Sequence, residues 1–311
     1  SFQNGILFNN NSLNFILNSN SGAIYGLFES ANSNGLINNI SNNNILFSNL
    51  SGSTNVYGIN TLLGASTAIK NITNNNITIT GNNTGISTGI IIGNGYGSIN
   101  NNIISINNAS TDINGIVAVQ TPGIGAYSLQ YNNINLNSSC VLNSSMKGIQ
   151  CGGLNNGPFQ ITNNSFSGLN FTGAVTGNIS LSAISISGGI GNNLSYNVIS
   201  NVSSGNSLSS GRPTMDGILI FSASSNNIFK NKIYNMNSLC SGLGLINGIT
   251  LNNGSSIVYN NLISGLSNSN STNTDAIRGI SIRSTAINTL NQIYNESASM
   301  KSLFNILPHK F

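Results

Sequence analysis

Aliphatic residues recur along the chain at fixed distances from asparagine rather than at helical spacing. In VYNNLISGLS, residues 258–267, Asn261 stands three residues after Val258 and two before Ile263. This apolar-x-x-Asn-x-apolar motif occurs in eight of ten repeats, with its last position spaced 26 to 34 residues apart and about 31 on average. The fourth and tenth repeats carry Ser98 and Asn288 at the first apolar position, which indicates a local shift of register there. The asparagines of the ten repeats are Asn11, Asn43, Asn75, Asn101, Asn132, Asn164, Asn197, Asn231, Asn261 and Asn291. Self-similarity at this period is typical of a solenoid.

A second motif lies between these asparagines and predicts a short strand. It consists of a small residue followed by Leu or Ile, as in NGITL at Gly248 and DGILI at Gly217. Two residues further on, a second aliphatic residue often follows, and this alternation indicates a strand with one buried face. Each repeat thus holds at least two short strands, which bury their aliphatic residues only by stacking on neighbouring repeats. We therefore predict an all-β fold, a parallel β-helix of about ten turns with about 31 residues per turn.

The asparagine of the first motif stands between two inward-facing aliphatic residues, where the strand must bend. Asn tolerates the left-handed backbone conformation, and its amide both donates and accepts hydrogen bonds. In a stack of repeats each amide can bond to the amides above and below it. We interpret the ten asparagines as an internal ladder; the alternative is a row of exposed turn residues.

The last residues differ from the repeats. In ASMKSLFNILPHKF, four apolar residues have the i, i+3, i+4, i+7 spacing of one helical face, and Pro308 ends the pattern. These residues are Met300, Leu303, Phe304 and Leu307. We predict a β-helix over residues 1–297 and a short amphipathic helix within 298–311, which either caps the last turn or docks on a partner. The alternative is a frayed tail.

Composition limits where such a protein can work. Charged residues make up only 5% of the chain and the net charge is +4. Amide and hydroxyl side chains must therefore provide most of the hydrogen bonds between its surface and water. Because cytosolic proteins usually rely on charge for solubility, this composition favours an extracellular or cell-surface location. The absence of a cluster of basic residues argues against nucleic acid as a partner. The sequence has no run of 18 apolar residues, so we expect no membrane span. Three cysteines are too few for a disulfide framework, and whether Cys140 and Cys151 pair is open.

The repeats resemble a known class of proteins. VYNNLISGLS with NGITL, and LSYNVISNVS with DGILI, are similar to motifs of right-handed parallel β-helix proteins of the pectin-lyase-like class. Within that class they look most like large secreted surface proteins of Bacteroidetes-type bacteria, which are substrates of type IX secretion. The resemblance covers residues 1–296 and implies a right-handed winding of the chain. The sorting domain that often ends proteins of that group is not in this sequence.

Residues suited to chemistry are sparse. The five acidic residues fall on different repeats and at different positions within them, so we expect no pair of carboxylates, no metal site, no cofactor and no catalysis. Tyr131 and Tyr196 both precede a predicted ladder asparagine, and Lys230 shares that position beside Tyr196. Aromatic faces along a rod can stack on sugar rings. We therefore expect a structural and adhesive rod with flanking domains or other subunits at its ends, and as the alternative a non-catalytic glycan-binding module.

Overall fold

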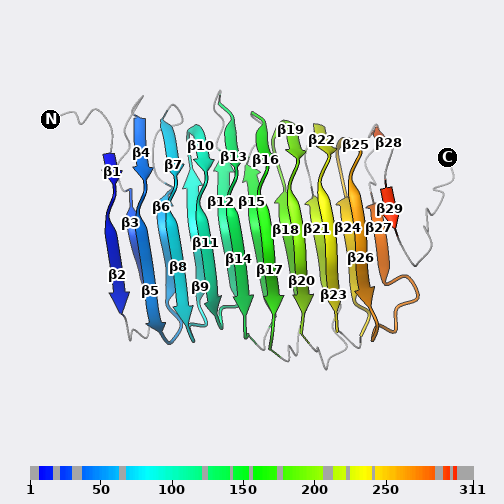
Figure 1. Cartoon of the computed structure of the whole chain (residues 1–311), viewed down its shortest axis with the longest axis horizontal. Coiled ribbons are helices and arrows are strands. Elements are labelled where there is room, and N and C mark those ends of the chain that lie inside the picture. The colour runs from blue at the N-terminus through cyan, green and yellow to red at the C-terminus, as the bar shows by residue number, and fades with distance from the viewer. Residues whose placement is uncertain are drawn as a thin grey trace.

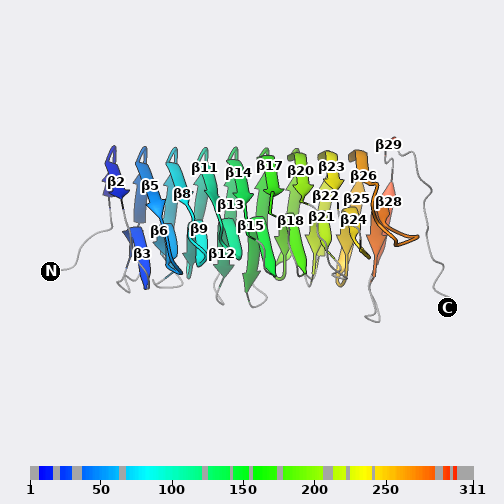
Figure 2. The same ribbon diagram turned by 90° about the horizontal axis from the view of Figure 1, so that it is seen from below.

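The computed structural model describes residues 7–16, 22–29, 37–62, 68–120, 125–140, 143–153, 157–173, 178–205, 213–221, 225–239, 242–283, 290–294 and 297–299. Within these ranges the regular secondary structure consists of strands, and every strand pairing is parallel. The strands form three sheets that run along a rod, with β1 at one end and β28 and β29 at the other (Figures 1 and 2). The parallel β-solenoid predicted from the sequence is confirmed.

The first sheet contains ten strands, one from each successive repeat. They are β1 (Leu7–Asn9), β4 (Ile37–Ser41), β7 (Ile69–Thr73), β10 (Tyr96–Asn100), β13 (Tyr127–Gln130), β16 (Phe159–Thr162), β19 (Ile190–Ser195), β22 (Ser225–Phe229), β25 (Ser255–Tyr259) and β28 (Asn291–Tyr294).

The second sheet also contains ten strands, and the first nine begin just after a ladder asparagine. They are β2 (Ser12–Ile16), β5 (Asn44–Leu50), β8 (Asn76–Gly81), β11 (Ile103–Asn108), β14 (Asn133–Ser138), β17 (Ser165–Phe171), β20 (Val198–Ser204), β23 (Lys232–Ser238), β26 (Leu262–Asn268) and β29 (Ser297–Ser299).

The third sheet contains nine strands and carries the small-residue motif. They are β3 (Ala23–Phe28), β6 (Asn55–Thr61), β9 (Ile86–Gly93), β12 (Asp112–Gln120), β15 (Ser144–Gly153), β18 (Ile179–Ile186), β21 (Thr214–Ile220), β24 (Leu245–Leu251) and β27 (Ile277–Ile282). The repeat is about 32 residues long, close to the predicted 31. Ten complete turns are not confirmed, since one sheet has nine strands among the described residues.

Inward-facing aliphatic residues of all three sheets form one continuous core along the rod. The glycines of the second motif lie where the third sheet comes closest to the second. A Cβ on Gly58 would come within 2.5 Å of the carbonyl oxygen of Gly89 and 2.6 Å of Cγ2 of Ile77. The small residue therefore reflects close approach to the next strand of its own sheet, at Gly89, and to the second sheet, at Ile77, and not a turn.

The predicted asparagine ladder is buried inside the corner between the first and second sheets. Asn43, for example, donates a hydrogen bond from Nδ2 to Oδ1 of Asn75 over 2.9 Å. The same bond links each successive pair in the series Asn11, Asn43, Asn75, Asn102, Asn132, Asn164, Asn197, Asn231 and Asn261. The ladder is confirmed for eight of the ten predicted asparagines.

Two predicted ladder positions are wrong. In the fourth repeat the ladder residue is Asn102, whereas Asn101 is exposed with a left-handed backbone. Ile104 then takes the anchor position and Ile99 the preceding apolar position, so this repeat fits the motif without exception. In the tenth repeat Asn291 lies on the first sheet, in register with Ser256. It stands five residues before the position that matches Asn261, so it does not continue the ladder.

The predicted C-terminal helix is not confirmed. Residues 297–299 form strand β29, which pairs with β26, so the helix does not begin at residue 298. The proposed cap residues Met300, Leu303, Phe304 and Leu307 lie outside the described residues.

Candidate functional site

A left-handed turn precedes each ladder asparagine and aims one side chain outward from the corner. All nine residues at this position have φ between 55° and 60°. Each donates its backbone N–H to a carbonyl on the next coil, as Tyr196 does to Phe229 over 3.3 Å. Six of the nine are asparagine, and the other three are Tyr131, Tyr196 and Lys230. Residues other than Asn and Gly pay about 1 kcal/mol for this conformation. Such strain directs attention to these three side chains, because unfavourable backbone conformations are concentrated at functional sites.

Two of these three residues meet in an outward-facing cluster near one end of the rod. Nζ of Lys230 donates a hydrogen bond to the hydroxyl of Tyr196 over 2.9 Å and lies 5.1 Å from the centre of its ring. This hydrogen bond raises the pKa of Lys230. The structure therefore brings Tyr196 and Lys230 together, as their shared column predicts.

The cluster extends through aromatic residues that sequence analysis missed. The ring of Phe229 meets that of Tyr196 edge-on at 5.9 Å and stacks on that of Tyr259 at 4.8 Å. Tyr294 follows Tyr259 in register on β28 and is 49% exposed. These residues occupy the position two before the ladder asparagine or its equivalent, so alignment of the repeats on Asn231 and Asn261 would have revealed Phe229 and Tyr259. We call Tyr196, Phe229, Lys230, Tyr259 and Tyr294 the aromatic corner.

Tyr131 stands apart from the aromatic corner. It is 57% exposed and lies two coils before Tyr196, with Asn163 between them in the same column. At the usual strand spacing this separates the two positions by about 10 Å. The structure therefore does not bring Tyr131 into contact with the other two predicted binding residues.

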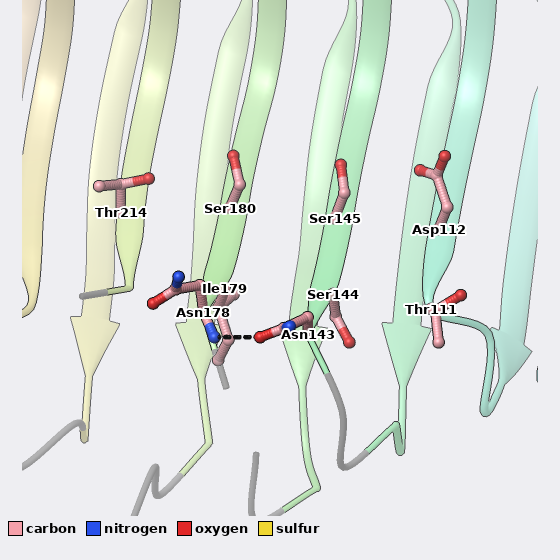
Figure 3. Close-up of a pocket in the computed structure, with 9 residues that line it drawn as sticks. All are labelled: Thr111, Asp112, Asn143, Ser144, Ser145, Asn178, Ile179, Ser180 and Thr214. Carbon is pink, nitrogen blue, oxygen red and sulfur yellow. Dashed lines mark hydrogen bonds between the residues drawn. The ribbon is translucent and has the colours of Figure 1, made fainter. Parts of the chain in front are cut away.

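A second polar feature is an open hollow at the edge of the third sheet, with a volume of about 530 Å³. Figure 3 shows one outward side chain from each of four successive strands in a row, namely Asp112, Ser145, Ser180 and Thr214. Asn143 and Asn178 flank this row, and the backbone N–H of Asn178 donates to Oδ1 of Asn143 over 2.7 Å. The hollow offers hydroxyl, amide and carboxylate groups that can bond to a polar ligand.

The described acidic residues lie in four separate environments. Oε1 of Glu29 accepts a hydrogen bond from Asn38, Asp112 accepts one from Asn114, and Asp275 pairs with Arg278. Asp216 is buried and accepts hydrogen bonds from Nδ2 of Asn247 over 2.8 Å and from Oγ1 of Thr250 over 2.5 Å. Burial raises the pKa of Asp216 against the opposing effect of these two bonds. Among the described residues no three His, Cys, Asp or Glu side chains gather to hold a metal.

Cys140 and Cys151 are not joined to each other. Cys151 faces the core from β15, and its burial raises the pKa of the thiol. The thiolate is the reactive form, so the Cys151 thiol is protected from oxidation by its surroundings.

No protein-family model, curated protein or solved structure matches this chain. In the part of the chain that the structure describes, no helix has the length and apolar character needed to cross a membrane.

Proposed function

We propose that this chain is a rigid, non-catalytic rod of an extracellular or cell-surface protein. Its role is to hold flanking domains or other subunits apart at its two ends and to present its outer faces for adhesion. The observation that carries this proposal is the unbroken ladder from Asn11 to Asn261, which runs beside one continuous core. Chain entry and exit at opposite ends of the described strands fit a spacer, because load then passes along the whole stack (Figure 1).

We further propose that the chain winds in a right-handed sense, belongs to the pectin-lyase-like class and is exported by type IX secretion. These three proposals rest on the resemblance of the repeats to motifs of Bacteroidetes-type surface proteins. Parallel strands joined by crossover connections are right-handed in nearly all known cases, which supports the proposed hand. The low content of charged residues in the chain supports the extracellular location.

Single-molecule stretching between handles at the two chain ends tests the spacer role. We expect the protein to keep its length under rising load and then to yield cooperatively. Asn197→Leu, which interrupts the ladder, should yield at a lower force, whereas the outward-facing Val198→Thr should match the parent protein. Gradual lengthening at low load would contradict a rigid spacer.

Antibodies against the rod should label intact source cells, and labelling only after lysis would contradict the surface location.

Glycan binding is the second candidate function, and the strained backbone at Tyr196 and Lys230 favours it. Phe229 and Tyr259 stack on each other, so the faces that they share are closed to a sugar ring. Tyr196, Tyr294 and the Lys230 ammonium at the margins of this stack are the groups that remain for a ligand.

A glycan array with matched variants separates the two functions. Tyr196→Asn and Lys230→Asn place the residue found on six other coils, so the fold should be retained. Glycan binding by the parent protein that both variants lose would support a binding module at the aromatic corner. Absence of binding, or binding that both variants keep, would leave the rod as the function.

A further inference from the structure

Three polar side chains that the proposed rod function does not use meet inside the first coils of the solenoid. Asn38 and Lys70 are register partners on the adjacent parallel strands β4 and β7, and both side chains are buried in the interior. Glu29, at the end of β3, is 5% exposed, Asn38 is 1% exposed and Lys70 is fully buried. An ionised pair in such a place costs free energy through desolvation, so its retention calls for an explanation.

The Glu29 carboxyl group contacts both of the other side chains. Oε1 accepts a hydrogen bond from Nδ2 of Asn38 over 2.6 Å, and Oε2 lies 3.4 Å from Nζ of Lys70. Nζ also donates to the carbonyl oxygens of Gly93, over 2.6 Å, and of Thr61. A primary amine, a carboxamide and a carboxyl group that touches both are thus held together away from water.

Burial also changes the protonation of this pair. Desolvation raises the pKa of Glu29 and lowers the pKa of Lys70, although each partner opposes the shift of the other. Both changes favour transfer of a proton from the ammonium to the carboxylate. A neutral amine has the lone pair that a nucleophile requires.

We propose that Lys70 and Asn38 react with each other to form an intramolecular isopeptide bond, with Glu29 as the proton carrier. Lys70 first gives one proton to Glu29. The lone pair of Nζ then forms a bond to Cγ of Asn38, and the bond between Cγ and Nδ2 breaks. A second proton passes from Nζ to Nδ2 by way of the Glu29 carboxyl group, and Nδ2 leaves as ammonia. One hydrogen stays on the new amide nitrogen, one rests on Glu29, and no oxidant or cofactor is needed.

The geometry suits this reaction because one carboxyl group holds the nucleophile and the leaving group. Productive attack requires Nζ to approach Cγ to about 3–3.5 Å, and adjacent parallel strands lie only about 4.8 Å apart. The product would join β4 to β7 covalently and replace a buried ion pair by a neutral amide. The inference does not depend on the proposed rod function, although a covalent clamp between two coils would strengthen a rod.

The lysine distribution gives a direct test. Lys70 is the first basic residue of the chain and Lys147 is the next, and trypsin does not cleave after an acylated lysine. The folded recombinant protein is denatured, digested with trypsin and analysed by tandem mass spectrometry. We expect a fragment of residues 1–147 that lacks the mass of one ammonia molecule and yields fragment ions linking Asn38 to Lys70. A fragment that ends at Lys70 with its full mass would overturn the proposal.

Matched variants distinguish the isopeptide from other losses of ammonia. Lys70→Arg should abolish the linked fragment, whereas Asn38→Asp should form the same link with loss of water. Glu29→Gln should leave Lys70 open to trypsin if it folds, as judged by circular dichroism. A link that persists in folded Glu29→Gln would contradict the role of Glu29. Because the parent protein alone decides whether the bond exists, a variant that fails to fold does not obscure the result.

Discussion

Nδ2 of Asn197 donates one hydrogen bond to Oδ1 of Asn231 on the next coil, over 2.9 Å, and another to the carbonyl oxygen of Ile161 on the preceding coil, over 2.8 Å. One buried amide therefore connects three coils. Asn164 and Asn231 make the same pair of bonds. The apolar residue at the start of each motif thus contributes a carbonyl to the ladder as well as a side chain to the core.

Replacement of a central ladder residue should destabilise the rod. In Asn197→Leu, Ile161 and the amide of Asn164 lose their buried partner, and an unsatisfied buried polar group costs about 1–3 kcal/mol. We expect the free energy of unfolding to fall by about that amount, measured from denaturant midpoints. The outward positions Ser165 and Val198 serve as controls, and polar replacements there should stay within about 0.5 kcal/mol. Equal effects at both kinds of position would contradict the buried ladder.

The left-handed corner should gain stability when its unusual residues are replaced. Tyr131→Asn introduces the residue that six equivalent corners carry and relieves about 1 kcal/mol of backbone strain. The reverse change, Asn163→Tyr, should lower stability by a similar amount. Thermal unfolding of both variants tests the pair, and a Tyr131→Asn protein less stable than the parent would show that the Tyr131 ring contributes more than its backbone costs.

Asp216 should make stability depend on pH. Its pKa in the folded protein is raised from the ordinary 3.8 because burial penalises the carboxylate. The folded state then binds more protons than the unfolded state just above pH 3.8, so stability should fall as pH rises through this window. Asp216→Asn keeps an oxygen for Asn247 and Thr250 and should remove this part of the slope. Urea midpoints across that range measure the difference, and identical slopes for parent and variant would refute it.

We expect no catalysis on acidic polysaccharides. The described acidic residues lie apart, and general acid–base cleavage needs two groups positioned at one bond. Pectate, polygalacturonate and alginate should show no turnover above buffer, with or without Ca²⁺. Turnover that disappears in Asp216→Asn would identify an active site at the third sheet and reverse this expectation.

The sequence by itself determined the class of fold. In successive repeats an asparagine stands three residues after one apolar residue and two before another, as Asn261 does between Val258 and Ile263. This recurrence requires stacked coils, because no single repeat can bury its own aliphatic residues. The same periodicity predicted the ladder and the shared column of Tyr196 and Lys230, since residues at equal positions in a solenoid stand above one another. The motif itself favours Asn102 over Asn101, because Ile99 and Ile104 then fill both apolar positions whereas Asn101 leaves Ser98 at the first. The hydrogen-bond column through Asn75 and Asn132 confirms Asn102.

Other features were decided by the tertiary structure alone. Alignment on the ladder asparagines places Tyr259 in the same column as Phe229, but only the packed structure shows that these two rings stack whereas Phe229 meets Tyr196 edge-on. The meeting of Glu29, Asn38 and Lys70 depends on how three coils pack around one interior point. The sequence pattern shows which residues share a face of the solenoid. It does not show which polar groups touch across the interior, because those contacts depend on distances that only the packed coils set.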